Sequence, residues 1–129
     1  MRAESGEFLS MLTDDEIGAL RAAGRPRRWD RGATVMSEGD TSDWVLVLTE
    51  GRVKVSSHTS SGTEVVLAVR GPGGLLGEMS AIDGSPRSAT VTALEPISGI
   101  VVRDFAGFLQ DHGRVAVLLM RMITGRLRD

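Results

Sequence analysis

The chain has 129 residues, of which 15 are Lys or Arg and 17 are Asp or Glu, so its formal net charge is −2. This balance excludes nucleic-acid binding by charge alone, because domains that bind nucleic-acid phosphates are strongly basic. The sequence has no cysteine, which excludes disulfides, a thiolate nucleophile, an iron–sulfur cluster and a cysteine-type zinc site. No apolar run is long enough to cross a membrane and the first residues lack the form of a signal peptide, so we expect one cytoplasmic domain.

A short helix is predicted near the start of the chain. Thr13 suits the N-cap position, and Glu16 stands three residues later, where it completes a capping box. Gly24, followed by Pro26, ends this helix.

From Arg27 to about Val102 the apolar residues follow a period of two, which indicates short strands. Turn residues rich in glycine separate the runs every 8–12 residues, as in a small antiparallel barrel or sandwich, and the turn at 60–63 predicts a hairpin. The strand-like runs are Trp29, 34–36, 44–48, 53–55, 65–69, 89–93 and 97–102.

Two helices are predicted after Arg103, where the period returns to about 3.6. Asp104 suits the N-cap of the first. The second has an apolar stripe that we interpret as the surface through which two copies of the chain pair, and it reaches the C-terminus without a stop signal, as if cut within the helix. The stripe consists of Val115, Leu118, Leu119, Met122 and Ile123. The arginines around this helix could form a nucleic-acid patch, but we interpret them as a solvated face and the flank of the pairing surface. They are Arg114, Arg121, Arg126 and Arg128.

The segment 75–91 interrupts the strand pattern and carries the candidate site. Gly77 allows a close backbone approach, and the residues after it can form one helical turn whose first N–H groups suit an anion. Arg87 and Ser88 can bring a guanidinium and a hydroxyl to the same anion, whereas the Glu78 carboxylate suits hydroxyl donors such as those of a ribose. The pattern favours a nucleotide site, although an ordinary loop with a surface Glu–Arg ion pair, worth about 0–1 kcal/mol, has the same residue types.

The motif Gly77-Glu78-Met79-Ser80, followed by Pro86 and then Arg87-Ser88-Ala89, resembles the phosphate-binding cassette of cyclic-nucleotide-binding domains. The resemblance extends over nearly the whole chain after Asp14 and is closest to bacterial transcription regulators of the catabolite activator type (Crp/Fnr). It implies a mainly β fold with flanking α: a double-stranded β-helix (a jelly-roll-like β-roll) with an N-terminal helix and two C-terminal helices, the last truncated.

The resemblance also implies the roles of individual residues. Glu78 would take the ribose 2′-hydroxyl, Arg87 the cyclic phosphate, and Ser88 and Ala89 would add hydroxyl and backbone donors. The apolar pocket walls would be Val55, Leu67 and Leu76, positions that also suit plain core packing.

The resemblance implies a 3′,5′-cyclic nucleotide as the ligand, and the Arg-Ser-Ala form favours cAMP. The residues that read the base in relatives would lie beyond Asp129. The implied domains are a nucleotide-binding β-roll over 1–112 and the start of a dimerisation helix over 113–129, with a DNA-binding helix-turn-helix expected after 129. Ligand binding would shift the long helix and so control the attached DNA-binding domain.

Other readings stay open. A degenerate member of the family would keep the fold and dimerise but bind another effector or none, and the domain could also regulate a kinase, a channel or a transporter. We expect no enzyme, because no nucleophile accompanies Glu78 and Arg87, and no metal cofactor, because His58 and His112 do not form a His-x-His pair. The expected partners are the nucleotide and a second copy, with DNA bound only through a further domain and no membrane partner.

Overall fold

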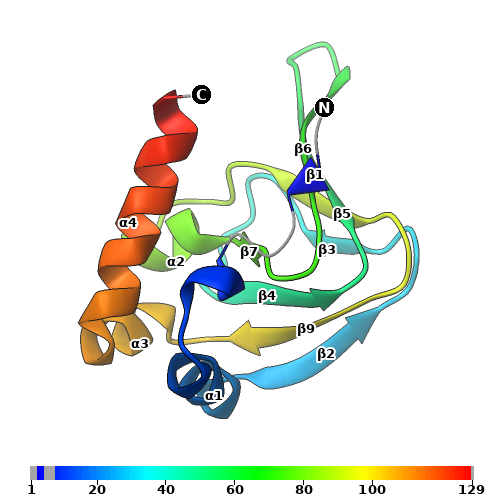
Figure 1. The fold of residues 1–129 in the computed structure, drawn as a ribbon. Coiled ribbons are helices and arrows are strands. Elements are labelled where there is room, and N and C mark those ends of the chain that lie inside the picture. Colours follow the sequence, from blue (N-terminus) through cyan, green and yellow to red (C-terminus); the bar gives the residue numbers. More distant parts are fainter. Residues whose placement is uncertain (1–2, 5–7, 129) are drawn as a thin grey trace.

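Two β-sheets packed against each other form a β-roll, and helices from both ends of the chain lie together at one side of it (Figure 1). The computed structural model describes residues 3–4 and 8–128. The described residues do not include Asp129, the last residue of the predicted final helix. They also leave out most of the first residues, from which we inferred that the chain has no signal peptide. This architecture confirms the predicted fold class.

The strands divide into a five-stranded sheet and a four-stranded sheet. The first has the order β1-β6-β5-β8-β3, with β1 (Ala3–Glu4), β3 (Thr34–Met36), β5 (Val53–His58), β6 (Glu64–Arg70) and β8 (Thr90–Ala93). The second has the order β2-β9-β4-β7, with β2 (Arg25–Trp29), β4 (Val45–Glu50), β7 (Leu75–Leu76) and β9 (Ile97–Val102).

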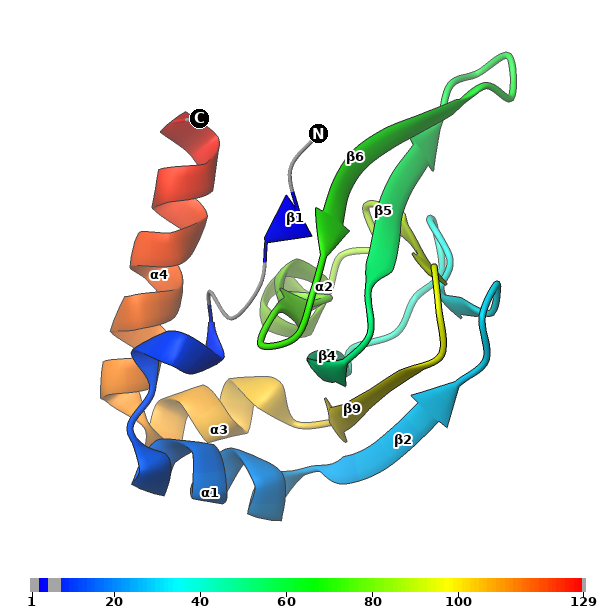
Figure 2. The same ribbon diagram turned by 45° about the vertical axis from the view of Figure 1, so that its right-hand side comes forward.

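The predicted hairpin joins β5 to β6. The Thr59 N–H donates to the Thr63 carbonyl over 2.9 Å, and the Gly62 N–H donates to the Thr59 carbonyl over the same distance. The tip of this hairpin extends beyond the other strands (Figure 2). The alternating pattern and turn chemistry on either side of 60–63 therefore located this hairpin correctly.

The predicted N-terminal helix is α1 (Asp14–Ala23), preceded by a 3-10 turn, η1 (Leu9–Met11). Its capping box is confirmed: the Thr13 hydroxyl accepts from the Glu16 N–H at 3.2 Å, and the Glu16 carboxylate accepts from the Thr13 N–H at 2.8 Å. Strand β2 begins at Arg25, before Pro26 rather than after it. Proline is tolerated there because β2 is an edge strand of its sheet.

Two clusters of buried side chains hold the fold together. One lies between the two sheets, and the other lies between the four-stranded sheet and helices α1, α3 (Phe105–Asp111) and α4 (Gly113–Arg128). Val45 and Val47 of β4 belong to the second cluster, whereas Leu46 and Leu48 belong to the first. Strand β4 is thus buried on both faces, and each of these fully buried side chains contributes about 1.5–3 kcal/mol.

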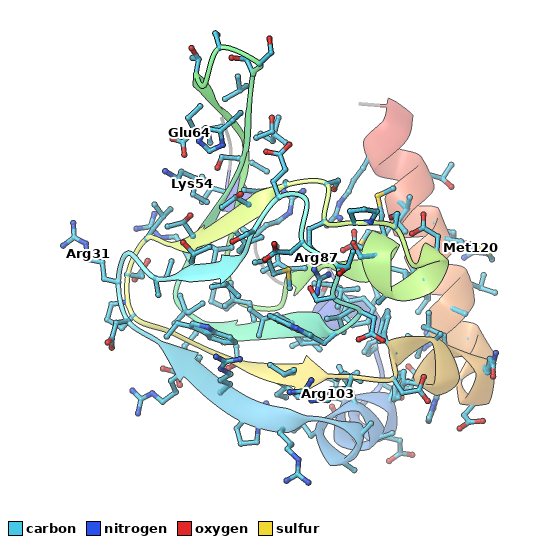
Figure 3. All side chains as sticks on the ribbon, turned by 180° about the vertical axis from the view of Figure 1, so that it is seen from behind. Arg31, Lys54, Glu64, Arg87, Arg103 and Met120 are labelled. Atoms are coloured by element: carbon cyan, nitrogen blue, oxygen red, sulfur yellow. The ribbon has the colours of Figure 1, made fainter. Side chains whose placement is uncertain are left out.

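Three of the five residues in the predicted pairing stripe on α4 are buried within this same chain. Val115, Leu119 and Met122 are 0%, 1% and 6% exposed within the second cluster, and Leu118 and Ile123 pack against it half-buried. The three buried side chains offer no surface to a second copy, whereas Leu118 and Ile123 keep part of their surface accessible. The exposed apolar side chains of α4 are instead Val117 and Met120, and Met120 points away from the sheets (Figure 3).

None of the helices in the described part of the chain has both the length and the apolar character needed to cross a membrane.

Candidate functional site

The candidate site is built around α2 (Glu78–Asp83), a helix of six residues where the sequence predicted one turn. Gly77 precedes it with φ +87°, a left-handed conformation that only glycine adopts without strain. A Cβ at Gly77 would overlap the Nη1 atom of Arg87 and lie 2.9 Å from Cε of Met36. Glycine is therefore needed here for the close passage of the Arg87 guanidinium, and the close backbone approach of an anion at Gly77 stays a prediction.

Arg87 follows the loop that leaves α2, and its side chain turns back into the molecule (Figure 3). It is only 4% exposed. Its Nε donates to the Ser42 hydroxyl over 2.8 Å, its Nη1 to the Gly77 carbonyl over 3.0 Å and its Nη2 to the Trp44 carbonyl over 2.6 Å. The guanidinium also lies 5.1 Å from the centre of the Trp44 ring, within the range of a cation–π contact.

Burial lowers the pKa of the Arg87 guanidinium, and the negative charges of Asp43 and Glu78 oppose that shift. Arginine stays protonated in proteins, so this group is a permanent cation with little contact with water. A buried cation of this kind favours an anionic ligand, because screening by solvent is weak there.

Glu78, the first residue of α2, is 9% exposed. Its Oε1 atom accepts a hydrogen bond of 3.3 Å from Nη1 of Arg126, which belongs to α4. Arg126 was interpreted from the sequence as part of a solvated face, and the structure corrects this. The signal that could have revealed it is its spacing, since Arg126 follows Met122 by four residues and so continues the buried face of α4.

A cavity of about 120 Å³ joins these groups. Nine of the ten predicted ligand-binding residues line it: Val55, Leu76, Gly77, Glu78, Met79, Ser80, Arg87, Ser88 and Ala89. The tenth, Leu67, is 53% exposed on β6 and is not among the described residues that line the cavity. It lies where the register of β5 and β6 shifts, between the pairs Val55–Ala68 and Ser56–Val66. The lining that sequence analysis did not name is Met36, Arg70, Leu75, Val91 and Arg126.

A second, larger cavity of about 430 Å³ lies beside the edge strand β2, lined by Arg25, Arg27 and Arg103 among others. None of the predicted site residues lines it in the described part of the chain. We therefore place the candidate site in the first cavity, where buried groups of opposite charge meet.

The two histidines lie in different surroundings. His112 ends α3, where its ring stacks on Phe108 with centroids 4.2 Å apart and its Nδ1 lies 2.9 Å from the Phe108 carbonyl oxygen. His58 ends β5, with its Nδ1 atom 4.0 Å from Oε1 of Glu38. In the described part of the chain, no group of three His, Asp or Glu side chains is arranged to hold a metal ion.

Comparison with known proteins agrees with this geometry. Residues 26–112 match the family described as cyclic nucleotide-binding domain. The CRP-like cAMP-activated global transcriptional regulator of Mycobacterium tuberculosis (strain H37Rv) is 30% identical over 114 residues, covering 87% of this chain and 51% of that protein. The chain thus spans about half the length of this relative.

Two solved structures share the fold. The N-terminal domain of a transcriptional regulator from Streptomyces coelicolor A3(2) has a TM-score of 0.74 at 37% identity, covering 95% of this chain and 87% of that chain. The Thermus thermophilus catabolite activator protein has a TM-score of 0.86 at 27% identity, covering 95% of this chain and 58% of that one.

Three features therefore agree: the β-roll, a cavity lined by a buried glutamate that begins α2 and a buried arginine that follows it, and the sequence match over most of the chain. The chain belongs to the family of cyclic nucleotide-binding domains.

Proposed function

We propose that this chain senses a 3′,5′-cyclic nucleotide, with cAMP as the preferred ligand, within a transcription regulator. The observation that carries the proposal is the pair of Arg87 and Glu78, both nearly buried, at the two ends of the α2 segment and lining one cavity. A cyclic nucleotide presents an anionic phosphate and a ribose hydroxyl a short distance apart, and these match a buried cation and a buried carboxylate.

In this proposal the Arg87 guanidinium pairs with the phosphate, and the Glu78 carboxylate accepts a hydrogen bond from the ribose 2′-hydroxyl. Ser88 and Ala89 line the cavity beside Arg87 and would add a hydroxyl and backbone N–H groups. The preference for cAMP rests on the Arg87-Ser88-Ala89 sequence and on the description of the Mycobacterium relative as cAMP-activated.

Ligand binding in this account moves α4. The cavity holds about 120 Å³, less than the roughly 300 Å³ of a typical ligand pocket, and Arg126 of α4 lines it. A ribose hydroxyl that reaches Glu78 competes with the hydrogen bond from Arg126. Such competition would bias the position of α4 and pass the signal to a DNA-binding domain that follows it.

A homodimer through α4 is the second part of the proposal. Because Val115, Leu119 and Met122 are buried, the pairing surface would include the exposed apolar residues of α4, Val117 and Met120, which are 43% and 59% exposed. Met120→Glu should then abolish a concentration-dependent rise in mass measured by sedimentation, with Arg121→Glu as a charge control on the same helix. A wild-type chain that remains monomeric at every concentration contradicts this part.

Thermal unfolding with and without nucleotide tests the ligand. Saturating cAMP at 100 times its Kd should stabilise the wild-type chain by about 2.7 kcal/mol. Arg87→Lys keeps a positive charge but loses the fork of donors, and Arg87→Leu loses both, so the shift should shrink in the first and vanish in the second.

Arg31→Leu is the matched control, because Arg31 is exposed on a turn away from Arg87 (Figure 3). It should respond to cAMP as the wild type does. A full shift in both Arg87 variants contradicts the phosphate role, and no shift with either cAMP or cGMP in the wild type contradicts the proposed ligand class.

A further inference from the structure

We propose that the segment 39–44 is a clamp that fixes the Arg87 guanidinium in its ligand-ready orientation before any nucleotide binds, with Ser42 and Trp44 as positioning residues. This inference rests on the proposed function, because it assigns Arg87 to an anionic ligand. It goes further by naming the residues that hold the Arg87 guanidinium in position.

The clamp begins with the backbone. The Gly39 N–H donates to the Arg87 carbonyl over 2.9 Å, and the Arg87 N–H donates to the Asp40 carbonyl over 2.8 Å. These two bonds fasten Arg87 to a segment that stands more than 40 positions earlier in the sequence. The base of the side chain is therefore fixed in space.

The same segment then holds the end of the side chain. Ser42 and Trp44, on the approach to β4, accept hydrogen bonds of 2.8 Å from Nε and 2.6 Å from Nη2 of Arg87. With the Gly77 carbonyl, which accepts from Nη1, each guanidinium nitrogen has a protein acceptor. A planar group held at three nitrogens has little freedom to rotate.

The arrangement also leaves donors for a ligand. A guanidinium has five N–H groups, and the three hydrogen bonds use one each on Nε, Nη1 and Nη2. One N–H on each terminal nitrogen remains as a donor for an anionic ligand in the cavity that Arg87 lines. Because the chain's own groups hold the long arginine side chain, binding does not have to order it, which lowers the entropic cost of binding.

The Trp44 ring gives this clamp a second means of holding the charge, through its contact at 5.1 Å from the guanidinium. The chain contains a matched pair for comparison, because Arg27 lies 4.7 Å from the ring centre of Trp29. Both rings are half-buried and pack against the core between the sheets. Arg27 lines the second cavity rather than the first, so Trp29→Leu controls for the loss of a half-buried tryptophan beside an arginine.

Two readouts test the clamp on the 129-residue chain. The first is the Nε–Hε NMR signal of Arg87 in the ligand-free protein, which should be sharp and slow to exchange with water. The signal should broaden in Ser42→Ala. It should remain sharp in Ser42→Thr, because threonine keeps the hydroxyl. The second is the Kd for cAMP by calorimetry. It should rise about 10-fold in Ser42→Ala, because a hydrogen bond to a charged group is lost, and about 2- to 5-fold in Trp44→Leu.

Trp44→Phe, which keeps an aromatic face, and Trp29→Leu should both bind cAMP within about 2-fold of the wild type. Ser42→Ala and Trp44→Leu chains that melt cooperatively but keep the wild-type Kd and Arg87 signal overturn the clamp. If Trp44→Leu does not fold, Ser42→Ala against Ser42→Thr decides the question. A wild-type chain that binds no cyclic nucleotide would contradict the proposed function but not the clamp. The NMR signal of the ligand-free protein would still show whether Ser42 holds Arg87.

Discussion

Arg126 on α4 donates a hydrogen bond of 3.3 Å to the carboxylate of Glu78 at the start of α2, although 48 positions separate the two residues in the sequence. Their side chains are 23% and 11% exposed, so the ion pair is largely shielded from water. It connects the final helix directly to the residue that we assign to the ribose.

Arg126→Ala should lower the free energy of unfolding by about 1–3 kcal/mol, because a nearly buried carboxylate loses a charged partner. Urea denaturation of the ligand-free chain measures this. The double variant Glu78→Gln/Arg126→Ala should regain more than half of the loss, since the uncompensated charge is gone. Arg121→Ala, an exposed arginine on the same helix, is the control, and an equal loss there would contradict the role of the Glu78 pair.

Glu78→Gln tests the ribose contact. The amide accepts a hydrogen bond less strongly than the carboxylate, so the Kd for cAMP should rise about 10- to 100-fold. The affinity for 2′-deoxy-cAMP should change much less, because that ligand has no hydroxyl to lose. Calorimetry with both ligands on both chains gives the comparison, and a variant that still discriminates between them as the wild type does would assign the hydroxyl to another residue.

Gly77→Ala tests the close packing around Arg87. Gly77 and Gly62 have the same φ of +87°, but a Cβ at Gly62 would meet no atom of the described residues within 4 Å. Gly62→Ala should therefore cost about 1 kcal/mol for backbone strain alone. Gly77→Ala should cost at least about 2 kcal/mol and also weaken cAMP binding, because Arg87 and Met36 must move. Equal losses for the two variants in urea denaturation would show that the close passage is unimportant.

Glu16 links the first helix to the last and gives the stability a pH dependence. Its carboxylate accepts from the Thr13 N–H at 2.8 Å and from Nη1 of Arg114 at 2.5 Å. The hydrogen bond from the Thr13 backbone, together with the charge of Arg114, holds the pKa of Glu16 below its usual value of 4.5. The stabilisation is therefore complete above pH 4.5 and is lost as the pH falls through the lowered pKa of the folded chain.

Glu16→Gln should consequently lower the Tm at pH 7, and the difference from the wild type should shrink as the pH falls below 4.5. Thermal unfolding between pH 7 and pH 3 measures it. Asp15→Asn removes a carboxylate from the same helical turn and is the control. A difference that stays constant across this range would contradict the role of the ionised carboxylate.

Local patterns predicted most of the fold because local chemistry determines it. The capping box at Thr13 and the turn at 60–63 depend on residues only a few positions apart, and both formed as predicted. The cassette around Gly77 and Arg87 is likewise one short segment, so its residues could be named before the cavity was seen.

What sequence analysis missed depends on tertiary packing. Ser42 and Trp44 meet Arg87 across 45 and 43 positions, and no local period encodes such contacts. The stripe on α4 shows a second limit. An apolar helix face predicts that its side chains are buried, but it does not identify the surface that buries them, which can belong to the same chain or to a second copy. Here the chain's own core covers Val115 and Leu119, and the apolar residues that α4 exposes are Val117 and Met120, which lie outside the predicted stripe.

The central claim is that Arg87 and Glu78 bind a cyclic nucleotide together, and a calorimetric titration of the wild-type chain with cAMP tests it most directly. We predict one site per chain, with cAMP bound more tightly than cGMP and at least 10-fold more tightly than 5′-AMP, whose phosphate is not cyclised. Absence of heat and of any thermal shift for both cyclic nucleotides, or equal affinity for 5′-AMP, would contradict the account.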